Sequence, residues 1–271
     1  MAQKKIVSAG PQAPGKQEST QQTAFVATPE AKKKALTYRL IAGALWIVAI
    51  AAEAVTIFWL IPHTELNNFM VWLIAAIVVI AVFAFVGAVL WKKSNRYDPA
   101  SEKNKVRFFV QNQLGAIITI VAFLPLIIFI FANKNMDKKQ KTIAGIVGIV
   151  VALVVLFAGG IDYAPPSTEQ IDDDTATVIA YTGQDKVYWV TGGSVYHLCA
   201  EHPEGTTIPP LARGDADTNP VIEGTVTQAV QAGKTRMSMY GFTECGLTEG
   251  QPQFGTLPNS ASSPEPSSTP S

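Results

Sequence analysis

The stretch FMVWLIAAIVVIAVFAFVGAVLW, residues 69–91, decides the fold of this chain. It has 23 consecutive residues without a charge, and its apolar side chains cover every side of a helix. A helix needs about 20 apolar residues to cross a hydrocarbon core of about 30 Å. A helix that is apolar all around is typical of a membrane span. The stretch predicts a transmembrane helix, because the remaining chain is too short to bury it inside a soluble protein.

Runs of the same kind occur at three other places in the first part of the chain. They are long enough to span a bilayer as helices, and they cover Leu40–Ile61, Phe108–Ala132 and Thr142–Ile161. The predicted fold class is therefore an α-helical membrane bundle of three or four hydrophobic helices, followed by a small α+β domain. The lipid bilayer is the one partner that the composition requires.

Charge is distributed unevenly along the 271 residues, although the formal net charge is zero. Residues 1–161 carry 17 Lys and Arg against 7 Asp and Glu, a net of +10, and residues 162–271 carry 4 against 14, a net of −10. Such asymmetry indicates two environments. The basic residues lie between apolar runs and indicate topology. The acidic half would repel phosphates, so no nucleic-acid partner is expected.

Lysine and arginine side chains indicate which loops face the cytoplasm. They are absent from the first loop, residues 62–68. They flank the first run and fill the second loop as Lys32, Lys33, Lys34, Arg39, Lys92, Lys93, Arg96, Lys103, Lys105 and Arg107. The third loop carries Lys134, Lys138, Lys139 and Lys141, which favour the cytoplasm as well. This last group conflicts with simple alternation of four spans.

Residues 108–132 can follow two paths, and the path decides the side of the C-terminal half. A span would leave the third loop outside and the C-terminal half in the cytoplasm. A re-entrant hairpin would split the 25 residues into two limbs of about 12 residues that rise about 18 Å each, half a bilayer, and Pro125 is a candidate for the break. Length favours the span, whereas charge favours the hairpin. We predict the hairpin, with a cytoplasmic N-terminus and an extracytoplasmic C-terminal domain in the cell membrane.

The composition divides the chain into five regions. Both ends are rich in small and polar residues, which predicts disorder, and a Pro-containing acidic segment predicts a linker. The regions are a disordered cytoplasmic tail at 1–38, a membrane domain at 39–161, an acidic linker at 162–175, an α+β domain at 176–246, and a disordered Pro/Ser tail at 247–271.

Within the α+β domain, β-branched and aromatic runs indicate strands. A strand is expected at Thr177–Tyr181, and a hairpin joins Lys186–Val190 to Ser194–Leu198 through Thr191-Gly192-Gly193. Thr225 and Gln228 have the spacing of a capping box that opens a helix. Gly233 stands where a glycine ends a helix. Lys234–Phe242 is a candidate last strand.

The chain has two cysteines, Cys199 and Cys245, and both lie in this small domain. A domain of about 70 residues is marginal without a covalent or metal cross-link, so we expect a disulfide and hence an oxidising compartment. A zinc site is the alternative, with His197, Cys199, His202 and Cys245 as ligands of suitable type. Two free thiols are a third possibility. No other cofactor is indicated.

Two segments of the domain resemble a known module. Val195-Tyr196-His197 and the later run GTVTQAVQAGKTR, residues 224–236, resemble a small module of uncharacterised actinobacterial membrane proteins. They are distantly similar to the zinc-binding module of the Ada DNA-repair protein. The resemblance implies the module's fold. It puts metal binding in doubt, because the Cys-x-x-Cys pair of those modules is missing after Arg236.

Glu53 is the one acidic residue inside an apolar run, and an intramembrane carboxyl is by default a functional hypothesis. It could serve in a small transporter or channel component, or it could pair structurally with Gln113 or Thr119. Nothing resembles a catalytic motif, so an enzyme is not expected. The leading hypothesis is a binding or structural domain displayed in the cell envelope.

The small residues Ala144, Gly148 and Ala152 share one face of the fourth run, because they are spaced by four. Such a face lets another helix approach closely. It is therefore a candidate surface for self-association or for binding an envelope protein.

Overall fold

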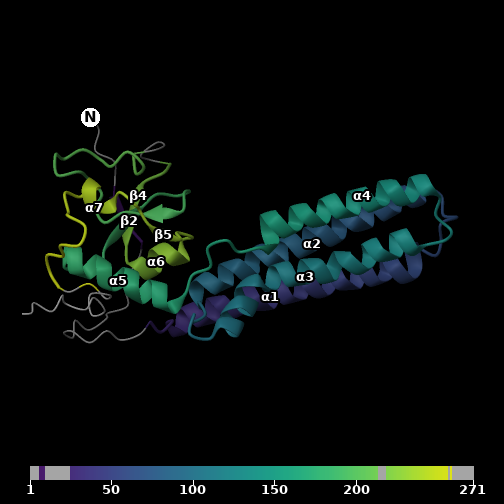
Figure 1. Cartoon of the computed structure of the whole chain (residues 1–271), viewed down its shortest axis with the longest axis horizontal. Coiled ribbons are helices and arrows are strands. Elements are labelled where there is room, and N and C mark those ends of the chain that lie inside the picture. The colour runs from purple at the N-terminus through teal and green to yellow at the C-terminus, as the bar shows by residue number, and fades with distance from the viewer. Residues whose placement is uncertain (1–5, 10–24, 213–217, 256, 258–271) are drawn as a thin grey trace, which may run out of the picture. The chain divides into compact units, whose positions relative to one another are not determined.

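The computed structural model describes residues 6–9, 25–212, 218–255 and 257. The described chain separates into two compact units (Figure 1). The first, which we call the bundle, comprises residues 27–167. The second, which we call the module, comprises residues 168–257 together with the described N-terminal residues up to Val26. Most of both predicted disordered tails lies outside the described residues.

Four long helices make up the bundle and run alongside one another (Figure 1). They are α1 (Pro29–Val55), α2 (Phe69–Tyr97), α3 (Lys105–Ala132) and α4 (Lys138–Val154). The π-helical turns η1 (Thr56–Leu60) and η2 (Val155–Gly160) extend α1 and α4. All four are long and apolar enough to cross a membrane. The predicted helical bundle is confirmed.

Large apolar side chains lie both inside the bundle and on its surface. Leu73, Ile77 and Leu126 are fully buried, whereas Ile47 and Phe58 are 70% and 76% exposed. A water-soluble bundle would bury its large apolar residues and present polar ones to solvent. The exposed apolar surface is what a hydrocarbon environment requires, because lipid is as apolar as the helix interior.

Helix α3 is continuous through Pro125, so the predicted re-entrant hairpin is wrong. Its 28 residues rise about 42 Å, which exceeds the hydrocarbon thickness of about 30 Å. Proline removes a hydrogen bond from a helix, but neighbouring groups in a membrane bundle can satisfy the freed backbone. Charge in the third loop was therefore a poorer guide to this helix than the length of its apolar run.

The module contains a three-stranded sheet in the order β1-β4-β2. Strand β4 (Val221–Gly224) pairs in parallel with β1 (Ile6–Ser8) and antiparallel with β2 (Val187–Trp189). Strand β1 comes from the segment predicted to be a disordered tail. It is paired through its backbone while its side chains stay exposed. The long-range pairing makes the N-terminal segment part of the module.

A second sheet pairs β3 (Val195–Tyr196) in parallel with β5 (Arg236–Met237). The predicted hairpin is present only in part, since β2 and β3 are linked by a single antiparallel bridge between Tyr188 and His197. Its turn forms at Gly192 and Gly193, both with positive φ. The predicted last strand is shortened to β5, and a short helix α7 (Gly241–Glu244) replaces its end.

Two further helices complete the module. Helix α6 (Val226–Gln231) begins with the predicted capping box of Thr225 and Gln228, and Gly233 with φ of 98° follows its end. Helix α5 (Thr168–Thr182) occupies part of the predicted linker and the whole predicted strand Thr177–Tyr181. That strand prediction is wrong, because Ile171, Val178 and Tyr181 are buried at helical spacing.

Candidate functional site

The disulfide between Cys199 and Cys245 joins two ends of the module. The Cα atoms are 5.8 Å apart, and 46 positions separate the residues in sequence. Cys199 follows β3, and Cys245 directly follows α7. Both sulfur-bearing side chains pack against a small core that contains Ile208 and Leu211. The predicted disulfide is confirmed, and it ties the end of α7 to the segment that follows β3.

A hydrogen-bonded group of polar residues lies beside the disulfide and centres on Glu244. His197 is 1% exposed, and its Nδ1 lies 2.9 Å from Glu244 Oε2. His202 Nδ1 donates to the Glu244 carbonyl over 2.9 Å. The Ser238 hydroxyl is 3.5 Å from the same carboxyl. Glu244 therefore fixes both histidines around Cys245, its neighbour in sequence.

The alternative zinc ligands are thus near one another, but their chemistry differs from that of a zinc site. Both cysteine sulfurs are bonded to each other and supply no thiolate. His197 and His202 are engaged by Glu244. Among the described residues, no three His, Cys, Asp or Glu side chains are grouped so as to hold a metal ion.

A hydrogen bond between the buried Tyr196 and the half-buried Asp174 links α5 to the second sheet. The Tyr196 hydroxyl donates to Asp174 Oδ2 over 2.6 Å. Burial raises the pKa of the Tyr196 hydroxyl, and the neighbouring Asp174 raises it further. Burial also raises the pKa of Asp174, although the Tyr196 hydrogen bond opposes this shift. The contact is structural, because the Tyr196 hydroxyl supplies the donor and Asp174 the acceptor of one hydrogen bond in the module.

Lys234 holds the turn between β2 and β3. Its side chain is 3% exposed, and its ammonium donates to the carbonyl oxygens of Val190 and Gly193 over 2.7 and 3.1 Å. A third bond goes to Gly192. The sequence does not reveal this role, because a lysine after a helix end normally indicates a solvated position.

Glu53 lies inside the bundle on α1 and is 5% exposed. Its Oε1 accepts a hydrogen bond from the backbone N–H of Leu126 over 3.3 Å. Leu126 directly follows Pro125, where the hydrogen-bonding pattern of α3 is interrupted. The carboxyl therefore connects α1 to α3 at the proline, and this contact gives Glu53 a structural role.

The two partners expected for Glu53 are used elsewhere. The Thr119 hydroxyl donates to the Gly115 carbonyl in its own helix. The Gln113 side-chain amide donates to the Asp162 carbonyl over 3.0 Å. Pro125 in the facing helix was the signal that could have identified the partner of Glu53. A proline interrupts the backbone hydrogen bonds of a helix, so a nearby backbone N–H can bond to a side chain.

Polar side chains gather where α2 and α3 meet the segment after η2. Asp162 is 8% exposed, and its backbone N–H donates to Gln113 Oε1 over 3.4 Å. Lys92 donates to the Ile161 carbonyl over 2.6 Å. Burial raises the pKa of Asp162, whereas the charges of Lys92 and Arg96 oppose the shift. These contacts fix the chain where it leaves the last membrane helix.

The small-residue face of α4 is occupied within the same chain. Ala144, Gly145 and Gly148 are buried. A side chain at Gly145 would collide with the Phe131 ring of α3, and one at Gly148 would contact Ile127. The predicted close helix packing is therefore internal to the bundle. The third residue of the predicted face, Ala152, is partly buried against the same core.

No protein-family model, curated protein or solved structure matches this chain. The resemblance of the module to the actinobacterial membrane proteins and to the Ada module stays a prediction.

Proposed function

We propose that this chain is a four-span membrane protein that holds one binding or structural module, built from both ends of the chain, on a single face of the membrane. The observation that carries the proposal is the pairing of β1 with β4. Residues 6–8 and 221–223 cannot share a sheet through a bilayer, so both must lie on one side.

The number of helices agrees independently with this arrangement. Four spans return the chain to the side on which it began, and four helices of sufficient length are present. A hydrogen bond from the Phe25 N–H to Asp172 Oδ1 over 2.7 Å also ties the start of the chain to α5. The three-crossing path that would separate the two ends depends on a break in α3, and α3 has none.

The distribution of basic residues supports the cytoplasmic face for the module. Ten Lys and Arg flank the spans on the side shared by both chain ends, and four lie on the other side. Positive charges near the spans set orientation during membrane insertion. A disulfide forms only afterwards and reports the compartment in which the module resides. We follow the charges, because those on this side outnumber those on the other by ten to four, and this choice requires that the disulfide be reversible.

On the cytoplasmic face the Cys199–Cys245 bond is reversible. Two thiols lose two electrons and two protons to a disulfide oxidant when the bond forms, and a dithiol reductant reverses the step. Both cysteines are partly exposed, as a redox-responsive pair must be. Oxidation would then stabilise the module and reduction would loosen it. An extracytoplasmic module, as the sequence first suggested, would keep the bond permanently.

Reporter fusions at both ends of the chain test this proposal. We expect a cytoplasm-dependent fluorescent reporter to be active when fused before residue 1 and after residue 271. An enzyme active only outside the cytoplasm should be inactive at both points and active in the loop at residues 133–137. Reporters on opposite sides would overturn the shared module. Both ends outside would overturn the cytoplasmic assignment alone and favour display in the cell envelope.

A further inference from the structure

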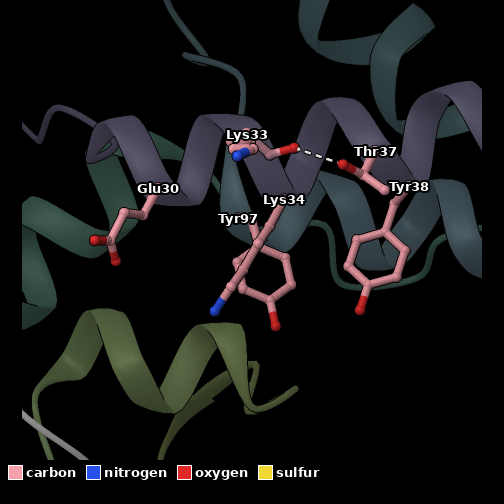
Figure 2. A pocket seen from close by; sticks show the side chains of 6 residues that line it. All are labelled: Glu30, Lys33, Lys34, Thr37, Tyr38 and Tyr97. Carbon is pink, nitrogen blue, oxygen red and sulfur yellow. Dashed lines mark hydrogen bonds between the residues drawn. The ribbon is translucent and has the colours of Figure 1, made fainter.

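We propose that the bundle binds the headgroup of an anionic phospholipid in a pocket between the start of α1 and the end of α2. The pocket is lined by Glu30, Lys33, Lys34, Thr37, Tyr38 and Tyr97 (Figure 2). Its volume is about 540 Å³, within the range of about 300–1,000 Å³ typical of small-molecule sites.

The two tyrosine rings of the pocket stack on each other, and each lies close to a lysine ammonium group. Tyr38 and Tyr97 stack with ring centroids 5.9 Å apart. The Lys34 ammonium lies 5.8 Å from the Tyr97 ring, and the Lys93 ammonium lies 5.0 Å from the Tyr38 ring. Cation–π contacts of this kind position the two ammonium groups without neutralising them.

The charge of the lining is left largely uncompensated. The ion pairs of the described residues are Arg39–Asp98, Lys186–Glu223 and His197–Glu244, so neither Lys33 nor Lys34 is in one. Figure 2 shows the Lys34, Tyr38 and Tyr97 side chains extending in the same direction, with the Glu30 carboxyl at a distance. Ammonium and phenol groups together are donors suited to a phosphate, which accepts several charge-assisted hydrogen bonds.

The position of the pocket favours a lipid over a soluble phosphate. It lies where the apolar runs of α1 and α2 end, at the depth where tyrosine and lysine anchor membrane proteins. Further along the same face of α1, seven and fourteen residues after Lys34, Ile41 and Val48 are 45% and 43% exposed. A phosphate held by the lysines would therefore have its acyl chains against an exposed apolar helix surface. Basic pockets between membrane helices bind anionic headgroups in this way.

The test compares two double variants of the full-length protein that lose the same charge. Lys33→Gln with Lys34→Gln alters the pocket, and Lys32→Gln with Lys103→Gln alters exposed lysines outside it. Binding of phosphatidylglycerol is measured in nanodiscs of otherwise zwitterionic lipid. We expect the pocket variant to weaken binding about thirtyfold, because each of its two lysines contributes about 1 kcal/mol, and the matched control to change it less than about twofold. Unfolding temperatures of both variants check that the bundle is intact.

Two further results would overturn the proposal. Equal loss in both double variants would mean unspecific attraction between basic residues and the membrane. The second concerns inorganic phosphate, which is titrated into nanodiscs without anionic lipid. The readout is chemical acetylation of the pocket lysines, which a bound anion should slow. If phosphate slows the acetylation and phosphatidylglycerol does not, the pocket binds a soluble anion. Protection by phosphatidylglycerol, together with loss of protection in Tyr38→Phe with Tyr97→Phe, would support the lipid site and the role of the phenols.

Discussion

The bundle and the module of this chain are stabilised by different kinds of interaction. The bundle consists of four helices of 17 to 29 residues, each of which satisfies its own backbone. The module consists of strands of two to four residues and three helices, and contacts between distant residues hold it together. The bundle is therefore specified locally, whereas the module depends on a few long-range contacts.

Three side-chain contacts in the module join segments that are distant in sequence. A disulfide, a buried lysine at a turn and the Tyr196–Asp174 hydrogen bond each join segments more than 20 positions apart. In the bundle the corresponding contacts are hydrogen bonds between helices and loops, such as those of Leu126 with Glu53 and of Lys92 with Ile161. Substitutions of comparable chemistry should consequently destabilise the module more than the bundle.

The largest effect is expected when the disulfide is removed. Cys199→Ser should lower the free energy of unfolding of the oxidised module by about 4 kcal/mol, because the bridge closes a long loop in the unfolded chain. Pulse proteolysis of the full-length protein in urea, with module fragments detected by mass, measures the change. The difference from the unmodified protein should vanish under a dithiol reductant. A difference that persists there would mean that the serine itself disturbs the core.

Removal of the Lys234 ammonium should have the next largest effect. Lys234→Met leaves carbonyls of the turn without their donor, and we expect a loss of about 2–3 kcal/mol, since a hydrogen bond from a charged group contributes about 1.5–3 kcal/mol. The same proteolysis assay measures it. Lys186→Met is the matched control, because Lys186 forms a partly exposed ion pair with Glu223. Such pairs contribute about 1 kcal/mol or less.

In the bundle, substitutions of Glu53 test how much its hydrogen bond to Leu126 contributes to stability. Glu53→Leu should lower stability in detergent by about 1 kcal/mol, because the Leu126 N–H loses its acceptor, whereas Glu53→Gln keeps an acceptor and should be nearly neutral. Thermal unfolding of the purified protein measures both. A flux across proteoliposomes that Glu53→Gln abolishes without unfolding the protein would contradict the structural role and favour the transporter alternative.

The last prediction concerns the pH dependence of the module, which appears only in strongly alkaline solution. Burial and the nearby Glu223 raise the pKa of Tyr188 from 10.0 to about 12. The folded module keeps the phenol proton where the unfolded chain loses it. The stability that Tyr188 contributes is therefore present below pH 10 and is lost as the pH rises through about 12. Tyr188→Phe should flatten this decline in unfolding experiments between these pH values.

The sequence predicted the bundle well because each apolar run adds the same signal over about 20 residues. Errors of a few residues at the ends leave such a helix recognisable, as α2 and α3 illustrate. In the module, the β-branched residues of Thr177–Tyr181 suggested a strand, but the spacing of Ile171, Val178 and Tyr181 makes one helical face. The capping box at Thr225 was predicted correctly, since its signal lies within four residues.

The sequence by itself determined that four apolar runs belong to a helical membrane domain and that two cysteines lie in a small acidic module. Both conclusions follow from composition and local spacing. Tertiary structure alone decided that α3 continues through Pro125 and that Glu53 accepts a hydrogen bond from the next residue, Leu126. It also decided that β1 pairs with β4. These features depend on which distant backbone groups meet, and neither periodicity nor residue type records that. The pairing of β1 with β4 therefore changes how the two ends of the chain relate to the membrane.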